Sequence, residues 1–374
     1  MTIYTKFINP LNGYSLYKSI NNDCTPSLNS SALKSIKPLL RDVLARGLFL
    51  SEISNPAKRA IGKLTIVTFH RVLPESLRRQ YPYPGICVTP DELRWFCSFF
   101  NDYFSVGSLT SIFKRWQSGE QPKKPFLAIT FDDGQLDNLQ YGLPILNEFD
   151  FKATFYIPAS NIDKADILWH DRIGYCTLTA RNNGEKVMQK TLELAQTYGI
   201  PAKPTSAFEN HIIQHSKRMS PEKRKLFIEA LECLLKTSPP EWGRLMTWNE
   251  IRLIQQRGHE IGSHSMTHAL MPQCSDQELK YEIAESKRRL ETELNTEITS
   301  FCYPNGDYDT RTVEAVRQAG YQNAVTTQWG KSQHEQSHFQ LKRCDVNTFN
   351  NWDRKQQLSA ARFALRLSGL QPGL

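Results

Sequence analysis

Two short motifs in this chain combine residue types that can bind a metal ion and activate water. Asp132 and Asp133 are adjacent in the pentapeptide TFDDG at residues 130–134, and His264 and His268 are four positions apart much later in the chain. Two imidazoles and one carboxylate leave an open position on an ion such as zinc, where water can lose a proton near neutral pH. Together the motifs predict a metal-dependent hydrolase.

The spacing within each motif allows its residues to take separate chemical roles. Successive side chains on extended backbone point to opposite sides, so Asp132 and Asp133 can take different roles, one on the ion and one facing water or substrate. On a helical turn, His264 and His268 would lie on one face, about 5–6 Å apart at Cβ, and could share one ion. For each motif alone, the alternatives are a solvated turn and an exposed or structurally paired histidine couple.

The surrounding patterns place both motifs at the carboxyl ends of strands. Residues 126–131 form an apolar run typical of a buried strand, and Gly134 gives the following turn its backbone freedom. Residues 248–256 have a helical pattern that Gly258 terminates, and a strand over residues 259–263 leads into the histidine motif. Strand ends on one rim are where barrel enzymes keep their chemistry.

Several stretches resemble the motifs of the polysaccharide deacetylases, the NodB homology domain of carbohydrate esterase family four. The first three family motifs are matched, in order, by TFDDG at 130–134, HSMTH at 264–268 and FCYPNG at 301–306. FHRVLP at 69–74 and ATFYIP at 153–158 extend the resemblance to about residues 64–346. It implies an α/β fold, a distorted (β/α) barrel with a helical insertion, and removal of acetyl groups from N-acetylated sugars of a poly- or oligosaccharide.

The resemblance also implies a role for each residue of the first two motifs. Asp133, His264 and His268 would hold a divalent metal ion, with zinc as the preferred candidate. The ion would polarise the acetamide carbonyl and activate a water, while Asp132 would act as the general base. The products would be acetate and a free amine.

Three further residues are the predicted contacts to the substrate. By analogy with the third motif, the backbone N–H of Tyr303, in the loop before Pro304, would stabilise the oxyanion of the tetrahedral intermediate. Trp169, next to His170, offers an aromatic stacking surface that suits a sugar site, although packing is the alternative for this pair. His170 is not predicted to be a metal ligand.

Two positions depart from the family pattern. An arginine of the third motif often orients the catalytic aspartate, and Cys302, which cannot form a charged two-point bond, stands in its place. A histidine acid on the last strand is also missing from LKRCDV at 341–346. Arg343 could orient Asp132 from the opposite side, and His70 could donate a proton or bind substrate. A surface charge for Arg343 and a core or capping role for His70 are the alternatives.

Length and composition predict a sizeable enzyme without disulfides. The 374 residues can bury a full barrel core, which needs about 250 residues, and the 8 cysteines are scattered without a Cys-x-x-Cys pair. No segment approaches the roughly 18–20 apolar residues of a membrane span, and the start of the chain lacks the apolar core of a signal peptide. The expectation is a cytoplasmic protein with reduced thiols.

Positive charge is concentrated at the start of the chain. Residues 1–63 hold nine Lys or Arg and three Asp or Glu, so they carry +6 of the net +8. Residues 33–48 alternate basic and apolar side chains, which is compatible with an amphipathic helix at the anionic inner face of a membrane; a helix packed on the barrel is the alternative. No motif for reading nucleic acid accompanies these residues, so nucleic-acid binding is not expected.

The chain is predicted to divide into three parts. Residues 1–60 are a basic leader and helix, residues 61–350 are the deacetylase barrel, and residues 351–374 are a basic amphipathic tail. Strand and helix patterns alternate to about residue 346, which predicts parallel βα units. Residues 160–245 interrupt the alternation with helical stretches and are expected to form a lid or substrate-selecting subdomain that carries Trp169.

These observations predict a metal-dependent N-deacetylase acting on an oligosaccharide, a polysaccharide or a lipid-linked glycan. Two alternatives from other classes stay open. A catalytically weak or inactive carbohydrate-binding member of the same fold would bind metal and glycan without releasing acetate. A membrane-surface accessory protein of glycan assembly would use the basic leader for docking.

Overall fold

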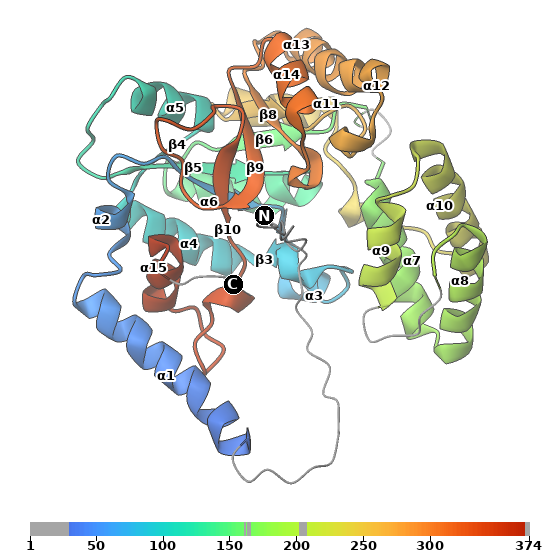
Figure 1. Ribbon diagram of the computed structural model, residues 1–374, viewed down its shortest axis with the longest axis horizontal. Coiled ribbons are helices and arrows are strands. Elements are labelled where there is room, and N and C mark those ends of the chain that lie inside the picture. The colour runs from blue at the N-terminus through green and yellow to red at the C-terminus, as the bar shows by residue number, and fades with distance from the viewer. Residues whose placement is uncertain (1–29, 161, 163–165, 202–207, 371–374) are drawn as a thin grey trace, which may run out of the picture.

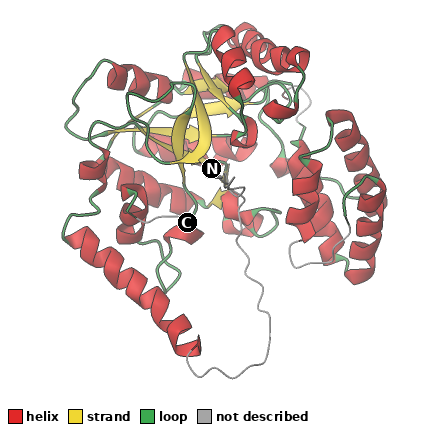
Figure 2. Ribbon diagram, in the orientation of Figure 1, coloured by secondary structure: helices red, strands yellow, loops and turns green. Residues whose placement is uncertain are grey.

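A closed barrel of parallel strands forms the centre of the protein (Figures 1 and 2). The computed structural model describes residues 30–160, 162, 166–201 and 208–370. Each strand of the barrel pairs with the next, and the last strand returns to the first, so the sheet has no open end. In order around the ring, the seven strands are β1 (Thr65–Phe69), β5 (Phe126–Phe131), β6 (Thr154–Ile157), β7 (Glu260–Ser263), β8 (Ser300–Cys302), β9 (Asn323–Trp329) and β10 (Leu341–Asp345). The predicted α/β barrel is confirmed.

Apolar strands explain why this ring is buried on both faces. All six residues of β5 are buried, as in parallel strands that helices cover on one side and core side chains fill on the other. The rings of Phe69, Phe131 and Phe155 stack across β1, β5 and β6, with centroids 5.4 and 5.0 Å apart. A short strand, β4 (Ser105–Gly107), pairs with the start of β5 beside the ring.

Amphipathic helices surround the barrel. A capping box of Thr89 and Glu92 starts α4, and the helix buries Phe96 and Phe100 against the strands. Two short strands, β2 (Arg71–Val72) and β3 (Cys87–Val88), pair beside the ring. The helices outside the insertion and the termini are α2 (Pro56–Ala60), α3 (Glu75–Arg78), α4 (Pro90–Tyr103), α5 (Leu109–Gln117), α6 (Leu143–Glu148), α11 (Trp248–Gln256), α12 (Asp276–Lys280), α13 (Ser286–Leu294) and α14 (Thr310–Gln318).

Four helices between β6 and α11 form an insertion with a hydrophobic core of its own. They are α7 (Trp169–Asn182), α8 (Glu185–Thr197), α9 (Phe208–Ser216) and α10 (Pro221–Leu235). Ile173, Ile212 and Phe227 are fully buried between them. In Figure 1 the four helices stand together on one side of the barrel. Residues 161, 163–165 and 202–207 of the predicted insertion lie outside the described residues.

The two terminal helices, α1 (Ser30–Leu50) and α15 (Ala360–Ser368), pack on one another. The predicted basic face of the C-terminal helix is not on a solvated surface, because Arg362 and Arg366 are buried. Arg362 reaches Asp42 of α1 at 3.3 Å, and Arg366 lies over the ring of Trp329, 4.4 Å from its centroid. Phe363 of α15 joins the aromatic core of α4.

Two expectations about the chain concern membranes and thiols. Among the described residues, none of the helices is long and apolar enough to cross a membrane. The seven cysteines in the part of the chain that the structure describes are all free thiols, as expected from their scattered positions. Residues 1–29, which include Cys24 and much of the predicted leader, lie outside that part.

A buried arginine joins the barrel to the insertion. Arg71 of β2 donates from Nε to Asp137 Oδ2 at 2.6 Å, and its Nη1 lies 3.4 Å from Oδ2 of Asp171 in α7. The hydroxyl of Tyr81 donates to the other oxygen of Asp171 at 2.7 Å. All four side chains are buried, so both carboxylates depend on Arg71 for their positive partner. The cluster fixes the first turn of α7 against the barrel.

Removal of this guanidinium should destabilise the protein strongly. We expect Arg71→Met to lower the free energy of unfolding by about 3–5 kcal/mol, because it leaves two buried carboxylates without a cation. Denaturant unfolding followed by circular dichroism measures the loss. The matched control is Arg94→Met, which breaks a surface pair with Glu148 at 2.7 Å and should cost at most about 1 kcal/mol. Equal losses in the two variants would refute the anchoring role.

Candidate metal centre

Asp133, His264 and His268 converge at the carboxyl end of the barrel, and we call these three residues the candidate triad. Asp133 follows β5 and His264 follows β7. Nε2 of His264 and Nε2 of His268 lie 3.4 and 3.3 Å from the same oxygen, Oδ1 of Asp133. All three side chains are buried, and one ligand atom from each lies within 4.8 Å of the others. One cation could therefore contact all three.

The two histidines lie on a loop, which we call the histidine loop (residues 264–270), and not on the predicted helical turn. Glu282 holds this loop, because its carboxylate accepts the backbone N–H groups of Met266 and Thr267 at 3.0 and 2.9 Å. These N–H groups have their partner outside the local chain, so no helical turn is needed to satisfy them. The prediction of a helical turn was wrong, and a long-range contact replaces it.

Of the nine non-glycine residues with positive φ in the described part of the chain, three lie in or beside the candidate triad. Asp133, Ser265 and His268 have positive φ values of 74°, 65° and 57°, in a region that non-glycine residues rarely adopt. Each such residue costs about 1–3 kcal/mol and persists only where the surrounding structure imposes it. Two of the three are members of the triad, so the fold stores strain to aim these side chains.

The donor atoms of the triad suit a divalent cation. Nδ1 of His264 donates to the carbonyl oxygen of Cys302 at 2.8 Å, so Nε2 is the nitrogen that faces Asp133 and would meet an ion. Burial lowers the pKa of His268 to about 4, so this imidazole is neutral at pH 7. Burial acts to raise the pKa of Asp133, but the two histidines hold it well below its usual value. Burial acts to lower the pKa of His264, but Cys302 and Asp133 hold it well above its usual value, so an incoming cation would displace the proton on Nε2. One carboxylate and two imidazoles are then a donor set for zinc and similar ions.

Asp132 lies beside the triad but has a different partner. Arg343 of β10 donates from Nη1 to Oδ1 at 2.7 Å and from Nη2 to Oδ2 at 2.8 Å, a two-point ion pair with side chains only 1 % and 3 % exposed. Arg343 also donates to Thr326 O and Thr68 Oγ1 at 2.8 and 3.0 Å. Burial acts to raise the pKa of Asp132, but the guanidinium holds it below its usual value. Asp132 is therefore ionised at neutral pH.

Cys302 and His70 complete the surroundings of Asp132. Sγ of Cys302 lies 3.6 Å from Asp132 Oδ2, and burial raises the pKa of this thiol, so it stays uncharged. Nε2 of His70 lies 3.8 Å from the same oxygen, which is too far for a direct hydrogen bond. The His70 side chain is 19 % exposed, whereas Asp132 and Cys302 are buried. His70 thus faces the site from its more open side.

The predicted oxyanion donor already has a partner in this structure. The backbone N–H of Tyr303 donates to the carbonyl oxygen of Val325 at 3.2 Å, and its buried side chain donates from the hydroxyl to Phe339 O at 3.0 Å. Pro304 is buried as well and has no N–H to offer. The pairing of β8 with β9 continues one residue past the end of β8 and uses this donor, so the oxyanion role of Tyr303 stays a prediction.

The insertion contributes two side chains to the site. Nε1 of Trp169 donates to the carbonyl oxygen of His268 at 3.2 Å. Nε2 of His170 lies 4.0 Å from Asp133 Oδ2 and 3.7 Å from Asp171 Oδ1, and burial lowers its pKa to about 4. The sequence alone favoured packing for this pair, and it missed the position of His170. One sequence feature could have indicated this position: Trp169 and His170 directly precede Asp171 at the start of the insertion.

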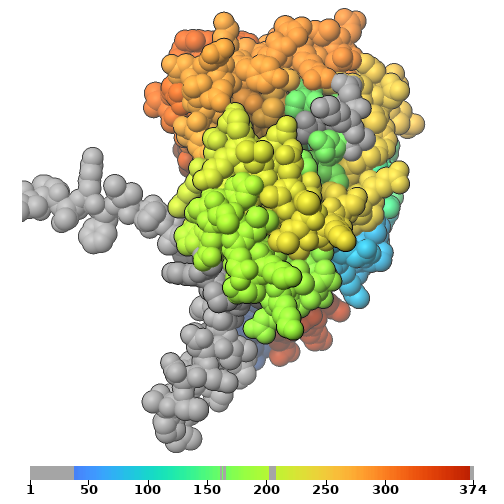
Figure 3. All heavy atoms as spheres, turned by 90° about the vertical axis from the view of Figure 1, so that its right-hand side faces the viewer, coloured from blue at the N-terminus to red at the C-terminus, as the bar shows by residue number. Residues whose placement is uncertain are grey.

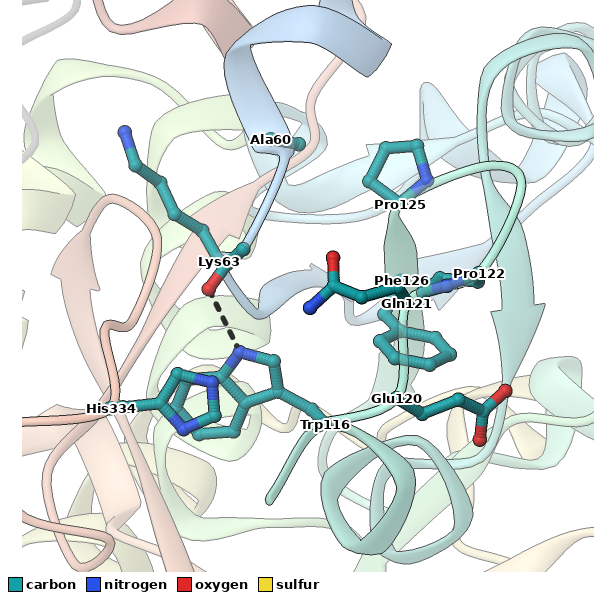
Figure 4. A pocket seen from close by; sticks show the side chains of 10 residues that line it. Ala60, Lys63, Trp116, Glu120, Gln121, Pro122, Pro125, Phe126 and His334 are labelled. Carbon is teal, nitrogen blue, oxygen red and sulfur yellow. Dashed lines mark hydrogen bonds between the residues drawn. The ribbon is translucent and has the colours of Figure 1, made fainter. Parts of the chain in front are cut away.

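A hollow of about 280 Å³ lies at the end of the barrel opposite the candidate triad (Figure 4). Lys63 and Phe126, which line it, stand just before β1 and at the start of β5, so the hollow opens at the amino ends of the strands. Trp116 stacks on His334 there, with centroids 4.0 Å apart, and donates from Nε1 to Gly62 O at 3.1 Å. Among the described residues, the groupings that could hold a metal occur only at the carboxyl rim.

Comparison with known proteins agrees with this geometry. The family model described as polysaccharide deacetylase matches residues 119–324, which include both aspartates and both histidines. YxkH of Bacillus subtilis (strain 168), a polysaccharide deacetylase by name, is 29% identical over 102 residues. That segment is 27% of this chain and 37% of YxkH, so the match spans little more than a third of this relative.

Two solved structures share the fold. The deacetylase PplD of Streptococcus pyogenes, in complex with acetate, has a TM-score of 0.52 and 17% identity, over 82% of this chain and 98% of PplD. The polysaccharide deacetylase BC0361 of Bacillus cereus has a TM-score of 0.50 and 16% identity, over 82% of this chain and 69% of BC0361. At such identities the likeness shows the fold alone. The match to the family model extends over more than half of the sequence, and the chain belongs to the polysaccharide deacetylase family.

Proposed function

We propose that this protein is a metal-dependent N-deacetylase that releases acetate from acetamido sugars of an oligosaccharide, a polysaccharide or a lipid-linked glycan. One observation carries the proposal: the ionised Asp132, held by Arg343, stands directly beside the buried candidate triad. A base and a set of metal ligands that belong to different side chains are what hydrolysis by an activated water requires. Family membership supports an acetylated glycan as the substrate class.

In the proposed mechanism, the three residues of the candidate triad would hold the ion, with zinc as the preferred candidate. Such an ion supplies Lewis acidity, which acidifies water and polarises an amide carbonyl. The carbonyl oxygen of Cys302 keeps His264 in the tautomer that presents Nε2 to the site. Trp169 steadies His268 through its hydrogen bond to the backbone carbonyl oxygen.

Asp132 would accept the proton of the attacking water. Arg343 is a positioning residue, because it contacts both carboxylate oxygens and leaves their remaining lone pairs to the site. The proton taken from water is the one that the leaving amine nitrogen needs, so hydrolysis is balanced without another acid. His70, 3.8 Å from Asp132 and partly exposed, is the proposed relay or substrate contact for that transfer.

Docking at a membrane surface is a second candidate activity, and α1 favours it. Leu40, Val43 and Leu44 are 60%, 59% and 58% exposed and lie on one face of the helix. Arg41 and Arg46 are also exposed, so apolar and basic groups alternate on the free surface. Such a helix inserts its apolar face among lipid headgroups while its arginines meet anionic lipids. We propose that the enzyme works at the cytoplasmic face of a membrane.

Substitution of the base should separate catalysis from metal binding. We expect Asp132→Asn to reduce kcat for acetate release by about 10²–10⁴, the usual contribution of a general base, with the bound metal retained. The neighbouring variant Asp133→Asn is the matched control and should lose the metal as well as the activity. Acetate release and metal content of the purified proteins are the two measurements. Unchanged turnover in Asp132→Asn would sink the mechanism.

Loss of Arg343 should change the dependence of activity on pH. The guanidinium lowers the pKa of Asp132, so Arg343→Met should raise that pKa. Because the base must be deprotonated, the acidic limb of kcat/KM should move to higher pH. Arg343→Lys, which keeps the charge without the two-point geometry, should move the limb less while lowering kcat. An acidic limb that stays in place in Arg343→Met would contradict the assignment of Asp132.

Membrane docking can be measured by cosedimentation with vesicles of phosphatidylcholine and phosphatidylserine. A buried leucine contributes about 1.5–3 kcal/mol, so the double variant Leu40→Ser, Leu44→Ser should bind at least about tenfold more weakly. The matched control replaces Leu226 and Leu234 of α10, which are 57% and 41% exposed, by Ser and should bind like wild type. Equal binding by the α1 variant and wild type would rule out docking through this helix.

A further inference from the structure

Arg224 of α10 is buried without a charged partner. Its side chain is 7 % exposed, and its Nη1 atom is buried with no hydrogen-bond partner. Within the described residues, Arg224 belongs to none of the ion pairs. Burial of an unpaired guanidinium lowers the stability of the folded protein, because the charge loses its hydration. Such a residue is expected chiefly where function requires it. The position therefore needs an explanation other than stability.

Two carboxylates near Arg224 have partners elsewhere, and a third, Glu222, is exposed on the same helix. Glu278 accepts the backbone N–H of Ser275 at 2.7 Å in a capping box. Glu282 accepts the backbone N–H groups of the histidine loop and the Thr267 hydroxyl at 2.6 Å. None of these oxygens comes within ion-pair distance of Arg224, so the guanidinium keeps N–H groups available for a ligand.

Arg224 lines a hollow of about 230 Å³ beside the histidine loop. Ala269 and Leu270, which directly follow the metal ligand His268, form part of its wall. In Figure 3 the yellow-green helices of the insertion abut the orange segment that follows this loop. The other lining residues are Pro221, Gln273, Cys274 and Glu278.

One aromatic ring connects Arg224 to the candidate triad. The guanidinium lies over Trp169, 4.2 Å from the ring centroid, and the indole N–H of Trp169 donates to His268 O. The stacking holds the guanidinium plane and leaves its N–H edge free. Lys217, from the loop before α10, donates to the Asn305 side chain in the third-motif loop. The insertion thus brings two cations to the rim that carries the triad.

We propose that Arg224 binds an oxyanion of the glycan substrate, either the carboxylate of an acidic sugar or the phosphate of a lipid-linked glycan. Arginine suits both groups, because its N–H edge matches two oxygens of a carboxylate or phosphate. Ala269 and Leu270 of the histidine loop line the hollow, so a glycan with its anionic sugar bound there would extend along this loop toward the candidate triad. The identity of the ligand as substrate rests on the proposed deacetylase function, whereas anion binding does not.

Calorimetric binding to full-length Arg224→Met and wild type tests the proposal. The probes are a neutral N-acetylglucosamine tetramer, a tetramer alternating N-acetylglucosamine with glucuronate, and N-acetylglucosamine 1-phosphate. We expect Arg224→Met to bind at least one acidic probe about tenfold or more weakly, as loss of charged hydrogen bonds implies, and the neutral tetramer as wild type does. The probe that is affected identifies the carboxylate or the phosphate source.

Lys225→Met is the matched control, since Lys225 lies on the same helix but its side chain is 74% exposed. It removes one positive charge and should leave all three affinities unchanged. Two results would overturn the proposal. In the first, Arg224→Met binds both acidic probes with the affinity of wild type; in the second, its affinity for the neutral tetramer falls as much as its affinity for an acidic probe. Binding is measured without turnover, so a wild type that binds an acidic probe but releases no acetate refutes the deacetylase function alone.

Stability gives an independent readout of the same residue. Methionine fills a volume similar to that of arginine without a buried charge, so the Tm of Arg224→Met should equal or exceed that of wild type. A purely structural arginine would behave in the opposite way, as expected for Arg71→Met. A fall in Tm comparable to that of Arg71→Met would show that Arg224 has a structural partner and would overturn the assignment.

Discussion

The buried ion pair between Arg343 and Asp132 is the interaction on which the arrangement of the site depends. Two full charges are removed from water, and this is tolerated because both carboxylate oxygens are paired and the guanidinium also reaches Thr68 and Thr326. The pair spans β10, β1 and β5, so it exists only when β10 closes the barrel against β1. Closure of the barrel therefore also positions Asp132.

The same pair accounts for the residue that replaces the third-motif arginine. Cys302 touches the oxygen of Asp132 that already accepts from Arg343. A second guanidinium at that position would bring a like charge into a space where one carboxylate cannot balance two cations. A small neutral thiol fits there, and it leaves the backbone carbonyl of Cys302 to orient His264. The two departures from the family pattern are therefore complementary: the charge missing from β8 is supplied from β10.

The sequence predicts well the features that depend on strand periodicity and on the fact that parallel strands end at the same rim. The barrel and the convergence of the triad depend on where strands end, and Arg343 was a candidate because parallel strands deliver their ends to one rim. What it predicts poorly depends on distant partners. The conformation of the histidine loop depends on Glu282, and the use of the Tyr303 N–H depends on the register of β9. Burial of Arg362 in α15 likewise needs Asp42 of α1.

His170 shows the same limit and points to the role of the insertion. Its place beside Asp133 follows from the position of α7. The buried contact between Arg71 and Asp171 fixes that helix against the barrel. On the side of the triad, Trp169 donates a hydrogen bond to the histidine loop, and Lys217 donates one to Asn305 in the loop of the third motif. The insertion thus contacts both loops that surround the candidate triad while it keeps a core of its own. A helical unit held at these points cannot move without changing the surroundings of the candidate triad.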